Sequence, residues 1–349
     1  MISAKFILSK NVVKKQVNKL KDLGLKLSYS YKTNREVGDV LQQILPATHF
    51  SIHAKEEVEM IHDKSKIWFF IQAESKEELI IILEKGVKNF VIDNEKDLEI
   101  LLQVLKQVKI KVNLSLRMKF KEHRIGTGKY FVYGMSSKKI NILVESIKDN
   151  LFIDKLGIHV HRKTQNTSEW EIKGELEDSL EKETLERINF LNLGGGLPSV
   201  YRGYSSNIFD YIYSKLIEVR NFLENKNIEV YIESGRFIAA PSVILVTEVV
   251  QIQDKNTLLI NTTIYNCALD TLITGTKMLV QGELEEGGED YLIKGNSPTR
   301  DDIFRYRVKL RSKKVGDGIV FLNAGAYNYT TDFFGDRKLE TEIVENFSE

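Results

Sequence analysis

The sequence predicts an α/β protein: a (β/α)8 or TIM barrel followed by an antiparallel β domain. Eight short apolar runs alternate with longer amphipathic segments over the first two thirds of the 349-residue chain, which is typical of parallel strands joined by crossover helices. No glycine-rich turn follows the first run, and this disfavours a doubly wound sheet, the main alternative. The runs cover residues 25–31, 48–52, 67–72, 89–92, 110–116, 156–161, 189–193 and 229–233.

Helical patterns fill most of the gaps between these runs. Ser75 stands directly before Lys76-Glu77-Glu78, a spacing that resembles a capping box and predicts a helix start. Amphipathic stretches cover residues 76–85, 95–107, 138–149 and 208–224.

The pattern changes after Pro241, where short strands follow one another without a long helix between them. This indicates a separate antiparallel β domain. We therefore expect the barrel to comprise residues 1–238 and the β domain residues 239–349. The predicted strands of the β domain cover residues 243–253, 258–264, 277–282, 291–294, 306–311 and 319–322.

The composition excludes several classes of function. The chain has 50 basic and 49 acidic residues, so it lacks the basic excess of a nucleic-acid-binding protein. It shows neither a signal-peptide run nor a long apolar stretch, and we expect a cytoplasmic protein without a membrane span. Cys267 is the only cysteine, which excludes an intrachain disulfide and a cysteine metal site.

His159 and His161 lie two residues apart and therefore share one face of a strand, as two metal ligands would. Further carboxylate or cysteine ligands are not near them, so we interpret them as packed strand residues and expect no metal site.

The first apolar run ends in a candidate nucleophile. Bulky Leu27, Tyr29 and Tyr31 alternate with small or polar side chains, the last of which is Lys32. This period predicts a strand with bulk turned outward to the helices and Lys32 at the mouth of the barrel. Desolvation there lowers the pKa of a lysine toward that of a free amine nucleophile. The alternative is a surface lysine that merely ends a strand.

Two further segments at strand ends suit an anionic ligand. Gly194, Gly195 and Gly196 follow the seventh run and predict a phosphate cradle, although a tight turn would have the same sequence. Arg236, after the eighth run, offers a bidentate phosphate contact. Glu233 ends that run, and a carboxylate at a barrel mouth needs a partner, which we expect to be a cation.

In chain order, five segments resemble motifs of the pyridoxal-phosphate-dependent decarboxylases of the ornithine, diaminopimelate and arginine group, which share the alanine-racemase-like fold (fold type III). Segment 31–34 resembles the family's Val-Lys-Ala-Asn, and 157–165 its Gly-Leu-His-x-His-Ile-Gly-Ser-Gln. Segment 192–198 resembles the phosphate loop, 233–236 the motif Glu-Pro-Gly-Arg, and 325–327 a segment with a phosphate-binding tyrosine. The resemblance covers nearly the whole chain.

The resemblance implies pyridoxal 5'-phosphate as cofactor, with Lys32, Glu233 and His161 as catalytic residues. Lys32 is then the Schiff-base lysine, His161 stacks on the pyridine ring, and Glu233 pairs with the pyridine nitrogen. A carboxylate at that nitrogen keeps it protonated and deepens the electron sink. Racemases of this fold carry an arginine there, so Glu233 favours decarboxylation.

The resemblance also implies a set of cofactor-binding residues. Thr164 replaces a phosphate-binding serine, Arg117 matches a barrel arginine near the cofactor, and Tyr327 reaches the phosphate. The implied set is Lys32, Arg117, His161, Thr164, Gly194, Gly195, Gly196, Glu233, Gly235, Arg236 and Tyr327.

A homodimer with shared active sites is implied as well, because a family segment that bears a catalytic cysteine reaches into the partner's site. The counterpart here, 295–302, has no cysteine. One alignment puts Arg300 in the cysteine position and Asp301 in that of the substrate-binding acid, and another puts Pro298 in the cysteine position. Arg300 aimed into the site favours a substrate with a distal carboxylate or acyl group. Arg300 paired with an acid outside the pocket would leave a plain diamino acid.

Other positions also depart from the family pattern. Lys163 replaces a glycine, Ser51 replaces a barrel aspartate, and Thr262-Thr263 replaces an Asp-Gly pair. The chain starts almost at the barrel, so we expect the usual N-terminal strands of the β domain to be trimmed.

We therefore expect a decarboxylase of an amino-acid substrate, either a diamino acid of the ornithine, lysine or diaminopimelate type or an acylated or carboxylated derivative, as in polyamine biosynthesis. Two alternatives stay open. One is a racemase or another enzyme on the same scaffold. The other is a non-catalytic cofactor-binding paralogue, suggested by the missing cysteine, although the retention of Lys32, Glu233 and Arg236 argues against it.

Overall fold

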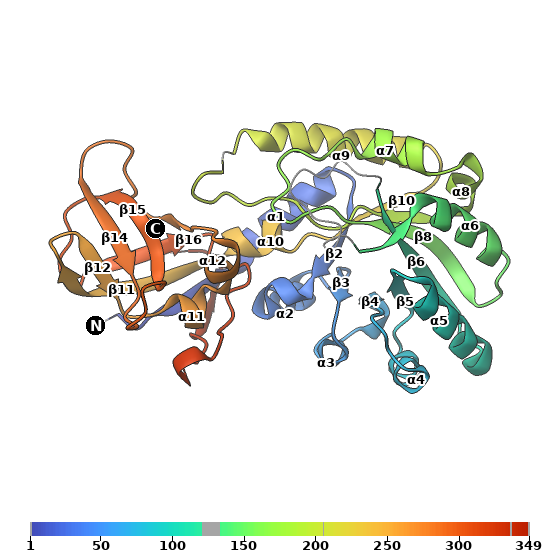
Figure 1. Ribbon diagram of the computed structural model, residues 1–349, viewed down its shortest axis with the longest axis horizontal. Helices are drawn as coiled ribbons and strands as arrows, with labels where there is room; N and C mark the ends of the chain where they lie inside the picture. Colours follow the sequence, from blue (N-terminus) through green and yellow to red (C-terminus); the bar gives the residue numbers. More distant parts are fainter. Residues whose placement is uncertain (1, 121–132, 205, 336, 348–349) are drawn as a thin grey trace.

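The computed structural model describes residues 2–120, 133–204, 206–335 and 337–347. A barrel of parallel strands surrounded by helices lies beside a second, mainly antiparallel sheet (Figure 1). Both chain termini lie at the second sheet (Figure 1). The predicted architecture, a (β/α)8 barrel with a β domain, is confirmed.

The barrel is a closed ring of eight parallel strands. Strand β10 pairs with β2, and β5 pairs with β6, and these two pairings close the ring. Each strand overlaps one of the predicted apolar runs. The strands are β2 (Lys26–Ser30), β3 (His49–Ile52), β4 (Ile67–Phe70), β5 (Asn89–Ile92), β6 (Val112–Lys119), β8 (Ile153–Val160), β9 (Phe190–Asn192) and β10 (Glu229–Ile232), with the short β7 (Met135–Ser136) paired to β6.

Helices link the strands and cover the outside of the barrel (Figure 1). The predicted capping box is present at the start of α4, where Ser75 and Glu78 bond each other's backbone N–H groups. The helices are α1 (Lys10–Asp22), α2 (Arg35–Ile44), α3 (Lys55–Val58), α4 (Lys76–Glu84), α5 (Glu95–Val108), α6 (Ser137–Ile147), α7 (Ile172–Ser179), α8 (Lys182–Arg187), α9 (Ile208–Glu224) and α10 (Arg236–Ala239).

The second sheet contains the six strands predicted after Pro241. Most of its pairs are antiparallel, but β12 runs parallel to β14. Two short helices, α11 (Ile264–Cys267) and α12 (Leu269–Thr274), follow β12. The six strands are β11 (Val243–Gln253), β12 (Thr257–Ile260), β13 (Leu279–Val280), β14 (Glu289–Lys294), β15 (Ile303–Leu310) and β16 (Gly318–Leu322).

The N-terminal segment corrects one expectation. Residues 1–238 were all assigned to the barrel, but β1 (Lys5–Ser9) pairs with β11 and with β17 (Thr341–Val344) in the second sheet. Phe6 and Leu8 are fully buried there, and this burial of apolar area holds the strand in the sheet. The rest of the predicted division, at residues 238 and 239, stays a prediction.

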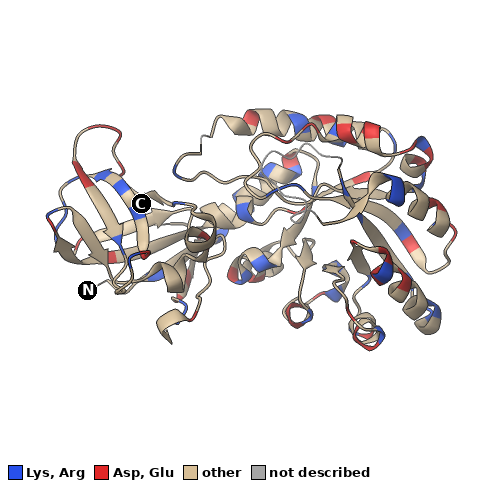
Figure 2. Ribbon diagram, viewed as in Figure 1, with Lys and Arg blue, Asp and Glu red and all other residues tan. Residues whose placement is uncertain are grey.

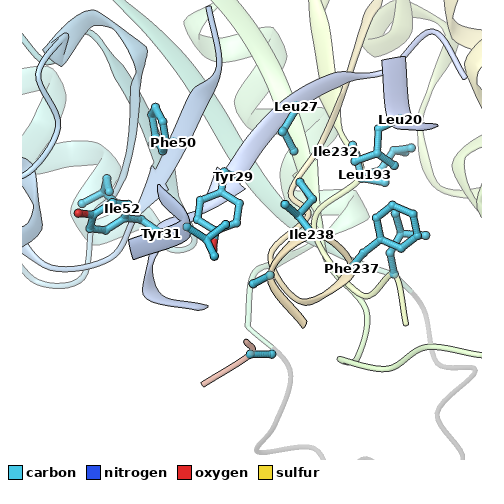
Figure 3. Packing of buried hydrophobic residues seen from close by; sticks show 14 of the residues in the cluster. Leu20, Leu27, Tyr29, Tyr31, Phe50, Ile52, Leu193, Ile232, Phe237 and Ile238 are labelled. Carbon is cyan, nitrogen blue, oxygen red and sulfur yellow. The ribbon is translucent and has the colours of Figure 1, made fainter. Parts of the chain in front are cut away.

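The outward face of β2 anchors the turn that carries Lys32. Tyr29 and Tyr31 lie edge-on to Phe50 of β3, with ring centroids 6.4 and 6.3 Å apart (Figure 3). The Tyr29 hydroxyl donates a 2.9 Å hydrogen bond to the carbonyl of Asn34. Bulk therefore points to the helices, as the alternating pattern predicted, and the chain after β2 is fixed at the barrel mouth.

Basic and acidic residues are intermixed along the outer helices (Figure 2), in a chain whose net charge is +1. Within the described ranges, no helix combines the length and apolar character needed to cross a membrane.

Candidate active site

A cavity of about 570 Å³ lies at the C-terminal ends of the barrel strands, and we call it the barrel-mouth cavity. It brings together residues from both ends of the barrel sequence and from the β domain, although they are far apart in the chain. The predicted site residues that line it are Lys32, Arg117, His161, Thr164, Gly195, Gly196, Glu233, Gly235, Arg236 and Tyr327.

Lys32 lies in a single 3-10 turn, η1 (Tyr31–Thr33), directly after β2. Burial is the main cause that lowers the pKa of its ammonium. The charge of Glu233 opposes this shift, and that of Arg117 adds to it. An amine that loses its proton more readily than an exposed lysine is the form that attacks a carbonyl group.

Glu233 follows β10 and is buried. His159 Nε2 lies 3.1 Å from its Oε2, and the Ser51 hydroxyl donates to its Oε1. Burial alone would raise the pKa of Glu233, but the His159 imidazole and the hydrogen bonds from both residues hold it well below its usual range. The expected partner was a cation; the structure provides an imidazole and a hydroxyl, so hydrogen bonds replace the salt bridge.

His159 and His161 lie with nearly parallel rings, 6.5 Å between centroids. Burial lowers the pKa of both imidazoles, that of His161 to about 3. The backbone N–H of Gly195 donates to His161 Nδ1 at 3.1 Å, so the neutral ring of His161 carries its proton on Nε2. Both histidines are thereby fixed by protein hydrogen bonds.

The glycine loop could not carry side chains. At Gly194, φ is +68° and a Cβ would lie 2.2 Å from the carbonyl oxygen of Val160. At Gly195, a Cβ would lie 2.9 Å from the carbonyl oxygen of Glu233. Gly194 packs against Val160 and His161, and Gly195 and Gly196 line the cavity. The loop therefore lies close against the ends of β8 and β10, with its backbone facing the cavity.

Arg236 lies between the barrel and the β domain. Its guanidinium donates two hydrogen bonds of 2.6 and 2.7 Å to Asp270 on α12 and one of 3.0 Å to the Tyr201 hydroxyl. Its Nε is buried and has no hydrogen-bond partner among the described residues. The fork predicted for phosphate is thus occupied by Asp270, and only the remaining N–H groups are left for an anion.

The β domain contributes Tyr327 to the cavity. Its backbone N–H donates a 2.9 Å hydrogen bond to the carbonyl of Thr33. Asn34 caps α2 and also donates to the carbonyl of Gly325 at 2.8 Å. The turn that carries Lys32 is therefore tied directly to the loop that carries Tyr327.

Arg300 and Asp301 lie outside this cavity. Their side chains are 93% and 65% exposed and contact each other at 3.2 Å. Asp302 is the buried acid of this segment, and it accepts hydrogen bonds from Ile264 N and from Ser297. A role of Arg300 or Asp301 in the site of a partner subunit stays a prediction.

Sequence reasoning missed several residues at this site. The His53 ring stacks on Phe70, with centroids 4.4 Å apart, and lines the cavity two positions after Ser51; the strand period would have pointed to it. Asp270 had no such signal, because it meets Arg236 only through the packing of α12.

Comparison with known proteins identifies the family. Residues 9–240 match the model of the pyridoxal-dependent decarboxylases, pyridoxal-binding domain. The chain belongs to this family. It is 26% identical over 180 residues to a carboxynorspermidine/carboxyspermidine decarboxylase of Herminiimonas arsenicoxydans, a match that covers 50% of this chain and 47% of the relative. It is 23% identical over 288 residues to the diaminopimelate decarboxylase of Methanocaldococcus jannaschii, covering 75% and 64%.

The chain thus spans between about half and two thirds of the length of these curated relatives. Solved structures show the same fold. The lysine decarboxylase of Selenomonas ruminantium superposes with a TM-score of 0.80 at 17% identity, covering 99% of this chain and 94% of that one. Diaminopimelate decarboxylase of Helicobacter pylori superposes with a TM-score of 0.82 at 18% identity, covering 99% and 92%.

The family cofactor, pyridoxal phosphate, fits the residues present. A lysine of lowered pKa, an ionised carboxylate and a glycine loop surround one cavity, and they match an aldehyde, a basic ring nitrogen and a phosphate. Buried polar atoms at its wall also lack a hydrogen-bond partner among the described residues, which suits a polar ligand. These atoms are Thr33 Oγ1, His53 Nδ1, Arg117 Nε and Arg236 Nε.

The close approach at Gly235 yields a prediction. In Gly235→Ala, the new Cβ would lie 2.0 Å from Thr33 Oγ1, so α10 and the Lys32 turn must separate. We expect a loss of about 1–3 kcal/mol in the free energy of unfolding and at least tenfold weaker retention of the cofactor, measured by urea unfolding and by visible absorbance. Gly174→Ala on α7 is the matched control, because its Cβ meets nothing within 4 Å; equal effects of the two substitutions would contradict this account.

Proposed function

We propose that this chain is a pyridoxal-phosphate-dependent decarboxylase of a diamino acid or of an acylated or carboxylated derivative of one. The observation that carries the proposal is that Lys32, with its lowered pKa, and the buried, ionised Glu233 line one cavity. The names of the relatives, which act on diaminopimelate, lysine and carboxynorspermidine, support the substrate class. A racemase is less well supported, because Glu233 occupies the position of the racemases' arginine.

The reaction breaks one C–C bond, releases CO2 and puts a proton on the carbon that carried the carboxylate. The cofactor supplies a conjugated ring that accepts the electron pair left by CO2. Lys32, whose amine is the kind of group that combines with an aldehyde, would hold the cofactor through its Nζ. Gly195, Gly196 and Tyr327 would hold the phosphate end, and Arg236 would donate to it from the N–H groups that Asp270 and Tyr201 leave free.

The remaining residues orient the ring and its charge. Glu233 would keep a proton on the ring nitrogen, and this would make the ring a better acceptor of electrons. His161 is held by Gly195 and presents a neutral imidazole to one face of the ring. We further propose a cytoplasmic homodimer in which segment 295–302 of each subunit completes the other's site.

Lys32 gives the central test. We expect borohydride to trap the cofactor on Lys32 in the loaded protein, and peptide mapping to recover the label there. Lys163 is the matched control: it lines the same cavity but pairs with Glu169 at 2.7 Å, so the label should survive in Lys163→Ala and vanish in Lys32→Ala. CO2 release from a panel of free and acylated diamino acids then identifies the substrate. A label on another residue, or no label, would refute the cofactor assignment.

The shared-site proposal predicts complementation between subunits. Lys32→Ala and Asp301→Ala proteins should each be inactive. After equal amounts are mixed, about half of the dimers are mixed and one of the two sites in each has both groups, so about a quarter of the total wild-type activity should return. Activity is measured as CO2 release, with subunit exchange verified by mass-tagged chains. Exchange without any recovery would show that each subunit builds its own site.

Arg300 gives a prediction about the substrate. If its guanidinium meets a distal carboxylate, Arg300→Ala should lower kcat/KM for a carboxylated diamino acid by tenfold or more and leave that for ornithine or lysine nearly unchanged. Arg311→Ala, in the same domain but outside segment 295–302, is the control. A preference for free ornithine or lysine that Arg300→Ala leaves untouched would exclude a distal carboxylate contact.

A further inference from the structure

The carboxylate of Glu233 is held from both sides by the barrel wall. Ser51 on β3 donates to Oε1, and His159 on β8 lies 3.1 Å from Oε2. Behind Ser51, the hydroxyl of Ser28 on β2 lies 2.8 Å from the Ser51 hydroxyl. All four side chains are buried. We call Ser28, Ser51 and His159 the Glu233 clamp.

The clamp donates hydrogen bonds but brings no positive charge. The serine hydroxyls are neutral, and burial lowers the pKa of His159, which favours a neutral ring that donates to Glu233 through Nε2–H. Lys32 and Arg117 line the same cavity, yet within the described chain neither lies at ion-pair distance from Glu233; His159 alone does. The negative charge of Glu233 is therefore solvated by the protein but not cancelled.

A buried anion in this state favours a cation beside it. Each oxygen of Glu233 accepts one bond from the clamp and keeps a lone pair for another donor. Hydrogen bonds to the charged form of a carboxyl group stabilise that form. If a proton is shared between Glu233 and a basic nitrogen, the clamp favours carboxylate and N–H⁺ over carboxylic acid and neutral nitrogen.

We propose that Ser51 and His159 are positioning residues that keep this shared proton on the ring nitrogen of the cofactor, with Ser28 orienting the hydroxyl of Ser51. The inference rests on the proposed function, which puts Glu233 against that nitrogen. The family pattern has an aspartate at the position of Ser51. In this chain Ser51 would help to keep the cofactor ring protonated, and a protonated ring withdraws electrons more strongly. The clamp touches neither the substrate nor the reacting carbon, and it acts through the charge of Glu233.

The position of the proton is the direct test. The protein is loaded with pyridoxal phosphate that carries ¹⁵N in the ring, and the ¹⁵N resonance is recorded at neutral pH. In the wild type we expect the resonance of a protonated ring. Ser51→Ala should move it toward the unprotonated value, and His159→Phe, which keeps a ring in place but removes the donor, should move it further. Ser51→Thr, which restores a hydroxyl, should return it.

Kinetics provide the second measurement. Loss of one hydrogen bond to a charged group should lower kcat about tenfold, with KM within about twofold, because substrate contacts are unchanged. The matched control is Ser115→Ala on β6: its hydroxyl is also buried in the barrel but has no hydrogen-bond partner among the described residues. It should leave the resonance and kcat unchanged.

Two results would overturn the proposal: an unprotonated ring in the wild type, or an unchanged resonance in Ser51→Ala that has bound the cofactor. Ser51→Ala removes one atom, so the test stands even if His159→Phe does not fold. Failure of the proposed function looks different, because borohydride would then not trap the cofactor on Lys32. If the cofactor is trapped on Lys32 and CO2 is released, but Ser51→Ala leaves the ¹⁵N resonance unchanged, the role of the clamp is refuted and the proposed function is not.

Discussion

Closure of the barrel is the constraint on which the site depends. Strand β10 pairs in register with β2, Tyr231 opposite Lys26 and Ile232 opposite Leu27. Parallel pairing places the C-terminal ends of both strands at the same rim, and so Lys32 and Glu233 line one cavity although most of the barrel sequence separates them. Neither residue is distinctive alone. Closure of the ring of strands puts an amine and a buried carboxylate in the wall of one cavity.

The second part of the chain contributes residues to this rim of the barrel. Tyr327 bonds the backbone of Thr33, and Asp270 holds the guanidinium of Arg236. Strand β1 joins the same sheet before the chain enters α1. The glycine-loop side of the cavity is thus built jointly by both parts of the chain, and a rotation of one against the other would separate Tyr327 from Thr33 and Asp270 from Arg236. The buried Arg236–Asp270 pair resists such rotation, since breaking it would leave a charge unpaired.

The repeated strands and helices of the barrel could be predicted from the sequence. The side-chain contacts between different elements could not. Apolar runs gave the eight barrel strands because burial on both faces leaves a continuous signal. Segment order located the residues of the cavity. Strand β1 was not predicted as part of the second sheet, because its five residues stand apart from the strands of that sheet in the sequence. The pairs Arg236–Asp270 and Glu233–His159 were not predicted either. Pairing of side chains from different elements depends on strand register and on how the elements pack, and the composition does not show these.

The serine at position 51 shows why such contacts matter for the chemistry. An aspartate in its place would set a second carboxylate against Oε1 of Glu233, and two buried like charges so close would force one group to keep a proton. Serine removes that competition and supplies a donor instead. His159 lies on the other oxygen of the same carboxylate, so both oxygens of Glu233 have a partner that can donate a hydrogen bond. A barrel built in this way can hold its anion ready before any ligand arrives, which is the preorganisation that electrostatic catalysis requires.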